Sequence, residues 1–198
     1  MPLFIISGPS QGGKTTLANL LLKDKNIVRV ITATSRKPRL DEIDKIDYYF
    51  LKEEYFENKS KFIEMAIVHG NYYGTLKSEI ELKLKSGKNV IWIMDVQGVK
   101  FILENYKELP KDTITIFLTP DKLSILLKRI NLKNDPNLKE RIESIKKEFS
   151  YLSFFKYTVN TSKTVDESLK CIKDIIKGNI KEDFTKQFNF NEFFTIKL

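Results

Sequence analysis

The sequence predicts an α/β fold in which helices cover both faces of a central parallel sheet. Apolar runs of strand length recur along the 198 residues, and helical patterns separate them. This alternation is typical of parallel strands that are joined by helical crossovers. One run ends in an acidic residue, Asp95, as expected for a buried strand whose carboxyl end lies at the active edge of the sheet. The expected strands cover residues 3–6, 27–34, 89–95, 113–118 and 156–160.

The loop after the first strand is the most specific motif of the chain. Gly8, Gly13, Lys14 and Thr15 fit the pattern G-x-x-x-x-G-K-[ST], between a strand and a helix. Such a loop turns its backbone N–H groups toward phosphates, while the lysine reaches the outer phosphates and the threonine hydroxyl ligates Mg²⁺. The alternative is a glycine-rich turn without function, and the flanking strand and helix argue against it. We therefore expect a nucleoside triphosphate site in a P-loop fold with three α/β/α layers.

Helical patterns fill the segments between the strands. Residues 165–176 place their apolar side chains on one face, and Pro136 fits the first position of another helix with Asp135 as its cap. The expected helices cover residues 15–23, 78–86, 99–106, 121–130, 136–149 and 165–176.

Two segments do not fit the alternation. Residues 35–75 are rich in tyrosine, charge and turn residues, and they read as an inserted mixed α/β unit. Residues 131–136 form a polar connector between two helices. An insertion on each side of a phosphate-binding core predicts two flaps that close over two substrates.

Composition narrows the class of protein. The net charge of +8 comes from lysines that alternate with glutamates, which favours a solvated charged surface over a nucleic-acid interface. No apolar stretch is long enough to span a bilayer, and the N-terminus shows no signal peptide, so we expect no membrane association. The single cysteine, Cys171, excludes an intrachain disulfide and fits a reducing cytoplasm.

Arginine is used sparingly. The chain has only five arginines, while every other strong base is lysine. The planar guanidinium can bind phosphate through two parallel hydrogen bonds, so each arginine is a candidate phosphate ligand. The five are Arg29, Arg36, Arg39, Arg129 and Arg141.

Three further motifs carry a resemblance to a known family. Residues 36–48 read RKPRLDEIDKIDY, residues 64–75 read EMAIVHGNYYGT, and residues 95–98 read DVQG. Together with the phosphate loop, they resemble guanylate kinase from about residue 3 to residue 177. The resemblance implies the reaction ATP + GMP → ADP + GDP, with dGMP as a second acceptor and Mg²⁺ as the cofactor.

The resemblance also implies a division of the chain. A core of residues 1–31, 89–128 and 142–198 would carry an inserted GMP-binding α/β subdomain of residues 32–88 and a short lid of residues 129–141. The tail of residues 178–198 extends past the resemblance and is rich in phenylalanine, so we expect it to pack on the body or on a second subunit. The chain is accordingly expected to be a monomer or a homodimer.

The implied site residues fall into overlapping sets, in which Thr15 would ligate Mg²⁺ and Asp95 would contact it indirectly. The expected catalytic residues are Lys14, Arg36, Arg129 and Arg141. The expected ATP-binding residues are Gly8, Pro9, Ser10, Gln11, Gly12, Gly13, Lys14, Thr15, Thr16, Arg129 and Asn160. The expected GMP-binding residues are Thr32, Arg36, Arg39, Tyr48, Glu64, Tyr73, Thr75, Asp95 and Gly98.

The chemistry of GMP agrees with these residue types. Its phosphate is a dianion and needs strong donors, such as the guanidinium groups of Arg36 and Arg39. The carboxylate of Glu64 can accept hydrogen bonds from guanine N1–H and N2–H₂, whereas adenine cannot satisfy it in this way. The single histidine, His69, is expected to have no chemical role, because the attacking phosphate oxygen is already anionic.

The sequence departs from the family pattern at three places. Gln11 stands where the family usually has glycine, and we expect Gly12 beside it to preserve the turn. Ile93 stands where an acid is common, two residues before Asp95. The lid is short and lacks the usual arginine-containing segment, with Lys133 as its nearest base, so we expect an effect on turnover rate.

Three alternatives stay open at this point. The chain could be a P-loop kinase for another phosphorylated acceptor, although Glu64 and the segment GNYYGT argue against it. It could be a catalytically silent guanylate-kinase-like module that binds phosphopeptides, although those modules typically have a degraded phosphate loop. A nucleic-acid binder rests on charge alone and has the weakest support.

Overall fold

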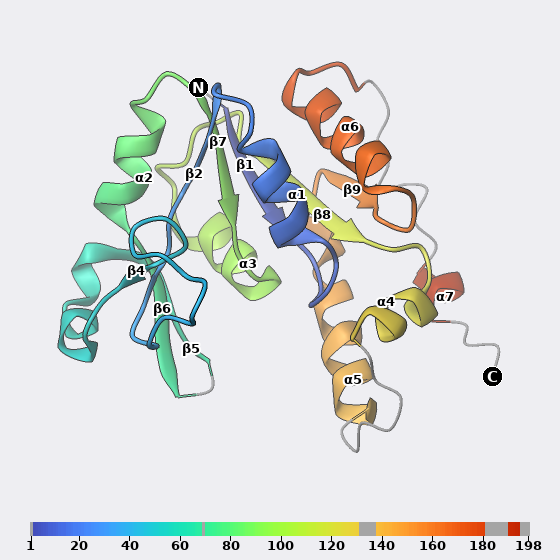
Figure 1. The fold of residues 1–198 in the computed structure, drawn as a ribbon, viewed down its shortest axis with the longest axis horizontal. Helices are drawn as coiled ribbons and strands as arrows, with labels where there is room; N and C mark the ends of the chain where they lie inside the picture. Colours follow the sequence, from blue (N-terminus) through green and yellow to red (C-terminus); the bar gives the residue numbers. More distant parts are fainter. Residues whose placement is uncertain (1, 69, 131–137, 181–189, 195–198) are drawn as a thin grey trace.

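The computed structural model of the chain describes residues 2–68, 70–130, 138–180 and 190–194. Five strands form a parallel sheet in the order β2-β7-β1-β8-β9 (Figure 1). The strands are β1 (Leu3–Ser7), β2 (Ile27–Arg29), β7 (Asn89–Ile93), β8 (Ile114–Thr119) and β9 (Tyr157–Asn160). All four strand pairs are parallel, which confirms the predicted parallel sheet.

Helices cover both faces of this sheet because its strands are apolar on both sides. Leu3 and Ile5 of β1 pack into one core cluster, and Phe4 and Ile6 pack into the other. The first cluster includes residues of α3 (Val96–Asn105), α4 (Leu123–Ile130) and α5 (Leu138–Phe149). The second includes residues of α1 (Lys14–Leu21) and α6 (Val165–Ile176). The three-layer α/β/α architecture is therefore confirmed.

A second sheet is built by the inserted segment. Its four strands follow the order β4-β3-β6-β5, with β3 and β4 parallel and the other pairs antiparallel. They are β3 (Ala33–Thr34), β4 (Tyr49–Phe50), β5 (Phe62–Val68) and β6 (Asn71–Leu76), and α2 (Lys77–Leu84) follows β6. Between β4 and β5 the chain forms only two short 3₁₀ helices, Glu53–Glu57 and Lys59–Lys61.

The expectation of one strand over residues 27–34 is wrong. The chain instead leaves the parallel sheet after β2 and enters the second sheet at β3. Val30 still donates to the carbonyl of Ile91 in the first sheet, while the carbonyl of Thr32 already accepts from Tyr49 in the second. An alternating apolar pattern does not reveal such a change of sheet, since both halves are extended and partly buried.

One helix begins earlier than its pattern predicts. Helix α3 starts at Val96 instead of Val99, because the Asp95 carboxylate caps it by accepting from the backbone N–H of Gly98 at 2.7 Å. The proposed cap at Asp135 and Pro136 lies outside the described residues, as do His69 and Lys133.

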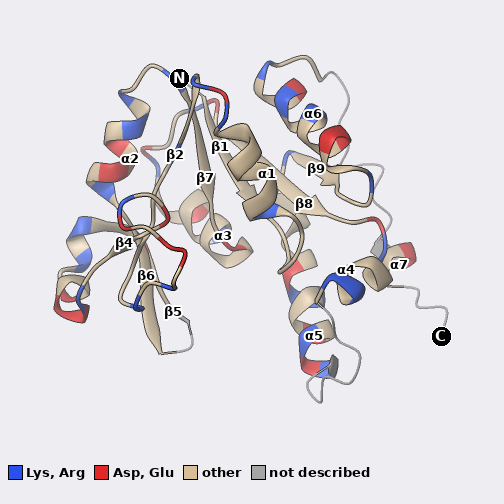
Figure 2. Cartoon of the chain, viewed as in Figure 1, with Lys and Arg blue, Asp and Glu red and all other residues tan. Residues whose placement is uncertain are grey.

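Part of the phenylalanine-rich tail packs on the body. Helix α7 (Phe190–Phe193) buries Phe193 in the core, where its ring lies 4.3 Å from that of Phe149 between centroids. Lys and Arg alternate with Asp and Glu along α2, α5 and α6, as expected for solvated surfaces (Figure 2). Within the described ranges, no helix has the length and apolarity needed to cross a membrane.

Candidate active site

The phosphate loop, residues 8–15, lies against the end of β8. Gly8 and Gly13 have φ angles of 142° and 103°, which side chains rarely adopt. A Cβ on Gly8 would collide with the carbonyl oxygen of Leu118, and a Cβ on Gly12 would lie 2.8 Å from the same oxygen. Gln11 itself takes the left-handed conformation, with φ at 61°. Gly12 therefore supplies space and not the left-handed turn that we expected of it.

Lys14 is folded back onto the loop. Its ammonium donates to the carbonyl oxygens of Gly8 and Pro9 at 2.6 and 2.9 Å. Burial lowers the pKa of Lys14, and the nearby carboxylates of Glu148 and Asp95 oppose that shift. Thr15 follows Lys14 in the exposed first turn of α1.

A pocket of about 250 Å³ opens beside the loop. Arg129, predicted as an ATP-binding residue, spans it by donating to the side-chain oxygen and the carbonyl of Thr161 and to the carbonyl of Gln11. The lining residues are Gln11, Gly13, Thr16, Leu17, Arg129, Thr161, Lys163, Val165 and Ser168. Sequence reasoning missed Thr161 and Lys163, although their position just after a predicted parallel strand could have placed them at this edge.

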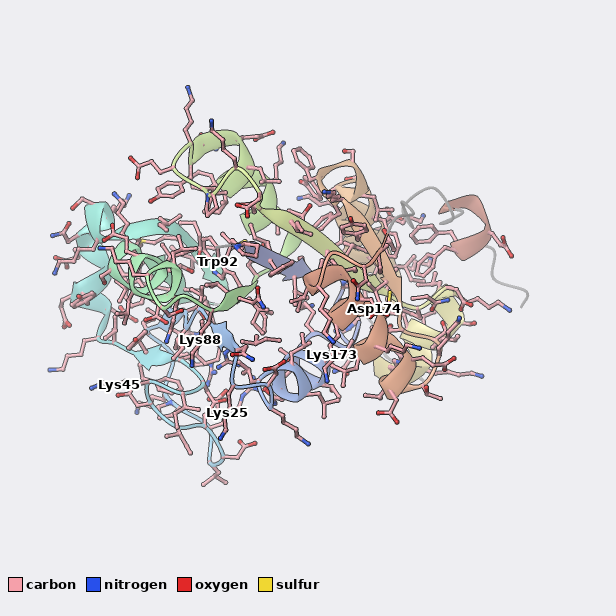
Figure 3. The ribbon with its side chains drawn as sticks, turned by 90° about the horizontal axis from the view of Figure 1, so that it is seen from above. Lys25, Lys45, Lys88, Trp92, Lys173 and Asp174 are labelled. Carbon is pink, nitrogen blue, oxygen red and sulfur yellow. The ribbon has the colours of Figure 1, made fainter. Side chains whose placement is uncertain are left out.

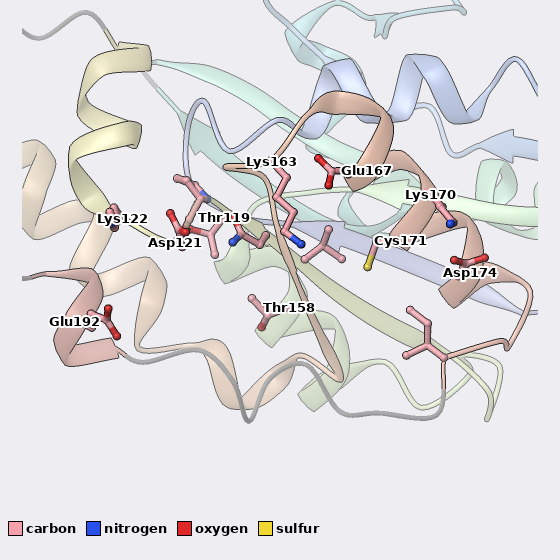
Figure 4. A pocket seen from close by; sticks show the side chains of 14 residues that line it. Thr119, Asp121, Lys122, Thr158, Lys163, Glu167, Lys170, Cys171, Asp174 and Glu192 are labelled. Atoms are coloured by element: carbon pink, nitrogen blue, oxygen red, sulfur yellow. The ribbon is translucent and has the colours of Figure 1, made fainter.

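Asn160 does not line that pocket. Its side-chain oxygen accepts from the backbone of Ser162 at 2.8 Å, and the residue borders another cavity of about 520 Å³ behind the loop that joins β9 to α6. Figure 4 shows Lys163, Glu167, Lys170 and Cys171 around that cavity. Asn160 therefore lies outside the lining of the pocket that Arg129 spans, although its neighbour Thr161 belongs to it.

A second cluster forms around Arg36. Its guanidinium pairs with both carboxylate oxygens of Glu42 at 2.8 Å and donates to the Tyr73 hydroxyl at 3.3 Å. The Tyr48 ring lies 5.4 Å from the guanidinium carbon and 6.2 Å from the Tyr73 ring. The predicted residues Arg36, Tyr48 and Tyr73 therefore meet in space.

Glu42 is a member of this cluster that sequence reasoning missed. Its hydrogen bonds with Arg36 lower the pKa of the Glu42 carboxyl to about 2. The backbone N–H of Arg39 also donates to this carboxylate at 2.8 Å, while the Arg39 side chain is exposed nearby. The sequence offered one indication of this pair, an acidic residue six positions after Arg36. Two other predicted residues contribute less: Thr32 offers a backbone carbonyl to Tyr49, and Arg141 is exposed on α5.

The third cluster centres on Glu64. Thr75 lies opposite Glu64 on the neighbouring strand and donates its hydroxyl to Glu64 Oε1 at 2.8 Å. Burial raises the pKa of Glu64 to about 7; the Thr75 hydroxyl opposes the shift and the Asp95 charge adds to it. Trp92, which the sequence analysis did not single out, donates its indole N–H to the same Thr75 oxygen at 3.2 Å.

Asp95 connects the clusters electrostatically. It contributes to the raised pKa values of both Glu64 and Glu148, so it lies near the Glu64 cluster and near Lys14. Its carboxylate is exposed but already caps Gly98 at the start of α3, which fixes its direction. Gly98 contributes this backbone N–H, and a Cβ there would lie 3.5 Å from the Asp95 carboxylate.

The residues near Lys14 fit Mg²⁺ that is held mostly by phosphates and water. Among the residues the structure describes, no group of three or more His, Cys, Asp or Glu could hold a metal by itself. Mg²⁺ in phosphate-transfer sites usually has one or two protein ligands and several waters. Within the described part of the chain, buried Glu148 Oε2 has no hydrogen-bond partner, and burial raises the pKa of Glu148 to about 7. Such a carboxylate oxygen can accept from metal-bound water.

Comparison with known proteins agrees with this arrangement. The family model described as Guanylate kinase matches residues 1–179. The guanylate kinase of Bartonella quintana is 36% identical over 179 residues, which cover 87% of this chain and 79% of that protein. The guanylate kinase of Mycoplasma genitalium is 39% identical over 182 residues, which cover 88% of this chain and 74% of that protein.

Solved structures show the same similarity. The crystal structure of guanylate kinase from Anaplasma phagocytophilum gives a TM-score of 0.69 at 25% identity, covering 92% of this chain and 88% of that chain. A shikimate kinase from Aquifex aeolicus shares the fold, with a TM-score of 0.51 at 17% identity over 90% of this chain and 98% of that chain.

Proposed function

The chain belongs to the guanylate kinase family, and we propose that it transfers the γ-phosphoryl group of ATP to GMP, and to dGMP, to form GDP and dGDP. The observation that carries this proposal is that Asp95 lines one pocket together with Glu64, while its charge acts on both Glu64 and Lys14. A donor site and a base-selecting site at one sheet edge are what direct transfer between two nucleotides requires.

On the donor side, the loop N–H groups and Lys14 bind the phosphates of ATP. Lys14 must leave the carbonyls of Gly8 and Pro9 to reach the β- and γ-phosphates. Arg129 lies across the adjoining pocket, where the nucleoside is bound. Thr15 would ligate Mg²⁺, and Asp95 and Glu148 would accept hydrogen bonds from waters bound to it. The ion would supply charge neutralisation for the phosphates.

On the acceptor side, Arg36, Arg39, Tyr48 and Tyr73 bind the GMP phosphate. Arg36 already binds two oxygens of an anion, the Glu42 carboxylate, through two parallel hydrogen bonds, and two oxygens of a phosphate can accept in the same way. The GMP oxygen attacks in line, and alignment with charge neutralisation supplies most of the rate enhancement. No general base is needed, so His69 has no role in the reaction.

Glu64 selects the base. Its ionised carboxylate accepts from guanine N1–H and N2–H₂, and Thr75 holds it in place. With adenine, the carboxylate would lack these donors, which costs about 1–3 kcal/mol.

The division of the chain follows from these roles. Residues 32–88 form the acceptor-binding unit, residues 129–141 form a lid that brings Arg141 to the transferring group, and the remainder is the core. Closure of both units excludes water that would otherwise hydrolyse ATP. We place the enzyme in the cytoplasm, as a monomer or a homodimer.

A coupled ADP-release assay with GMP, dGMP, AMP, UMP and CMP tests the proposal. We expect GMP to be the best acceptor, followed by dGMP. A better acceptor outside the guanine nucleotides would reassign the chain to another P-loop kinase activity. Phosphopeptide binding without any turnover would instead identify a silent module.

A further inference from the structure

We propose that Trp92 is a positioning residue for guanine selection, because its indole N–H restricts the directions open to the Thr75 hydroxyl hydrogen and so favours its donation to Glu64. This inference rests on the proposed function, since it concerns how the same base-selecting carboxylate is oriented. It adds a buried residue of the parallel sheet to the acceptor site.

The three residues form a chain of hydrogen bonds between the two sheets. Trp92 belongs to β7 of the parallel sheet, Thr75 to β6 and Glu64 to β5 of the second sheet. Trp92 and Thr75 are each 0% exposed, and the two bonds measure 3.2 and 2.8 Å. Figure 3 shows Trp92 in the interior of the molecule, whereas the labelled Lys25 and Lys45 lie at its edge.

The direction of each bond follows from the chemistry of the groups. An indole nitrogen only donates, so the Thr75 oxygen accepts from Trp92. The hydroxyl hydrogen of Thr75 is thereby excluded from the side of the indole, and donation to Glu64 Oε1 at 2.8 Å is one of the two directions left to it. Without the indole, the hydroxyl hydrogen gains a further direction that does not point at Glu64, which weakens the bond that favours the ionised carboxylate.

The protonation state of Glu64 decides which purine fits. An ionised carboxylate only accepts, and it matches the N1–H and N2–H₂ donors of guanine. A protonated carboxyl group offers one donor and one acceptor, which matches adenine N1 and N6–H₂. Burial favours the protonated form of Glu64, and the Thr75 bond opposes it, so the indole supports guanine selection through Thr75.

Packing provides the competing explanation, because Trp92 lies in the same core cluster as Ile63, Ile80 and Met94. Trp92 is the only tryptophan of the chain, which makes a clean test possible. Replacing it with 3-benzothienylalanine exchanges the indole N–H for sulfur at nearly constant shape and at one position. Trp92→Phe is the encoded variant with a similar loss of the donor.

Tyr49→Phe serves as the matched control. The Tyr49 hydroxyl donates at 2.8 Å to Glu79, a carboxylate that is 3% exposed and also accepts from Ile31 N–H. This variant breaks a hydroxyl–carboxylate bond of the second sheet away from Glu64. It should lower thermal stability and leave base selection unchanged.

The experiment measures KM and kcat for GMP, AMP and ATP between pH 6 and pH 9, together with thermal stability. In the benzothienyl variant we expect the KM for GMP to rise roughly fivefold to tenfold, the GMP-to-AMP preference to fall by a similar factor, and the KM for ATP to stay constant. The pH below which kcat/KM for GMP declines should be higher in the variant, because a weaker Thr75 bond favours the protonated form of Glu64. Thr75→Val should cause the same changes, and combining it with the benzothienyl substitution should add little.

Two results would overturn the inference. One is an unchanged pH profile and an unchanged GMP-to-AMP preference in the benzothienyl variant. The other is an equal loss of kcat/KM for GMP and for ATP, which would indicate that Trp92 acts only through packing. Failure of the wild-type enzyme to use GMP would instead refute the proposed function. The intrinsic fluorescence of Trp92 gives a readout without turnover: it should change on addition of GMP and not on addition of AMP.

Discussion

The phosphate loop and the acceptor clusters both bind phosphorylated nucleotides, but they are built in opposite ways. The loop takes its anion-binding groups from consecutive residues, 8–15, and shapes them with glycine and a helix start. The acceptor clusters take side chains from Arg36 and Glu42, which lie six residues apart, and from Glu64 and Asp95 on two other segments; these three segments meet only in the folded chain. Because the phosphate loop binds through its backbone, few substitutions preserve its conformation. The acceptor clusters bind through side chains, so a single substitution can change the affinity for one group of the ligand.

Electrostatics differ in the same way. In the loop, burial lowers the pKa of a cation, Lys14, while in the acceptor clusters burial raises the pKa of an anion, Glu64. Both groups bear charges that a substrate must compensate on binding. Each nucleotide therefore supplies groups of opposite polarity to a buried charge of the free protein: phosphate oxygens to Lys14, and guanine N–H donors to Glu64.

Removal of the loop cation should produce the largest effect. Lys14→Ala is expected to lower kcat by about a thousandfold or more, because one fixed donor to the developing charge is lost. Stability should be unchanged or higher, since a buried ammonium is removed. Calorimetry should still detect GMP binding, and the exposed Lys23→Ala variant is the control. Retained turnover in Lys14→Ala would remove the loop from the mechanism.

A change of the base-selecting carboxylate should be smaller and confined to the acceptor. Glu64→Gln keeps the size of the side chain but replaces one acceptor oxygen by a donor amide. We expect kcat/KM for GMP to fall about 10- to 100-fold, equivalent to about 1–3 kcal/mol, with the KM for ATP unchanged. Equal losses for both substrates in steady-state kinetics would contradict the assigned role.

The pH dependence of GMP binding offers a graded test of the same group. The pKa of Glu64 is raised to about 7, so the stability that this group contributes is full at low pH and is lost as the pH rises through 7. GMP requires the ionised form, so its affinity should rise over the same range and be about tenfold weaker one unit below the pKa.

The phosphate of GMP also titrates, near pH 6, and must be separated from this effect. Titration calorimetry of Glu64→Gln supplies that correction, because its remaining pH dependence comes from the ligand. An identical pH profile in wild type and variant would show that Glu64 does not titrate on binding.

The smallest effect should come from the strained loop residue. Gln11→Gly removes the cost of a left-handed side-chain residue, φ 61°, but adds freedom to the unfolded chain. We expect a gain of up to about 1 kcal/mol in the free energy of unfolding, with the KM for ATP within a factor of two. Denaturant unfolding of the two proteins measures it; a loss of stability would mean that Gln11 contributes contacts beyond its backbone.

The same contrast explains what the sequence could predict. The position of the loop between a strand and a helix was predictable from the order Gly8 to Thr15, but the left-handed conformation of Gln11 and the contact of Gly8 and Gly12 with Leu118 were not. The strands and the parallel sheet followed from apolar periodicity. The change of sheet after Arg29 was missed because extended segments look alike regardless of which sheet they join.

The acceptor clusters were predictable as a set of residues but not as a network. Motifs gave Arg36, Glu64 and Thr75, which the structure brings into their clusters. Glu42 and Trp92 were missed, since an acid in a charged segment and an aromatic residue in an apolar strand have many ordinary explanations. Only tertiary contacts distinguish these two from surface charge and core filling.

The contact between Phe193 and Phe149 ties helix α7 to the C-terminal end of α5. Phe149 ends the helix that carries Arg141 and Glu148, and Phe193 covers it five residues before the chain stops. Loss of the residues from Phe190 onward, through a premature stop codon or proteolysis, would expose the Phe149 ring and weaken the packing of α5. Residues distant in sequence from the phosphate loop thus contribute to how firmly α5 packs on the core.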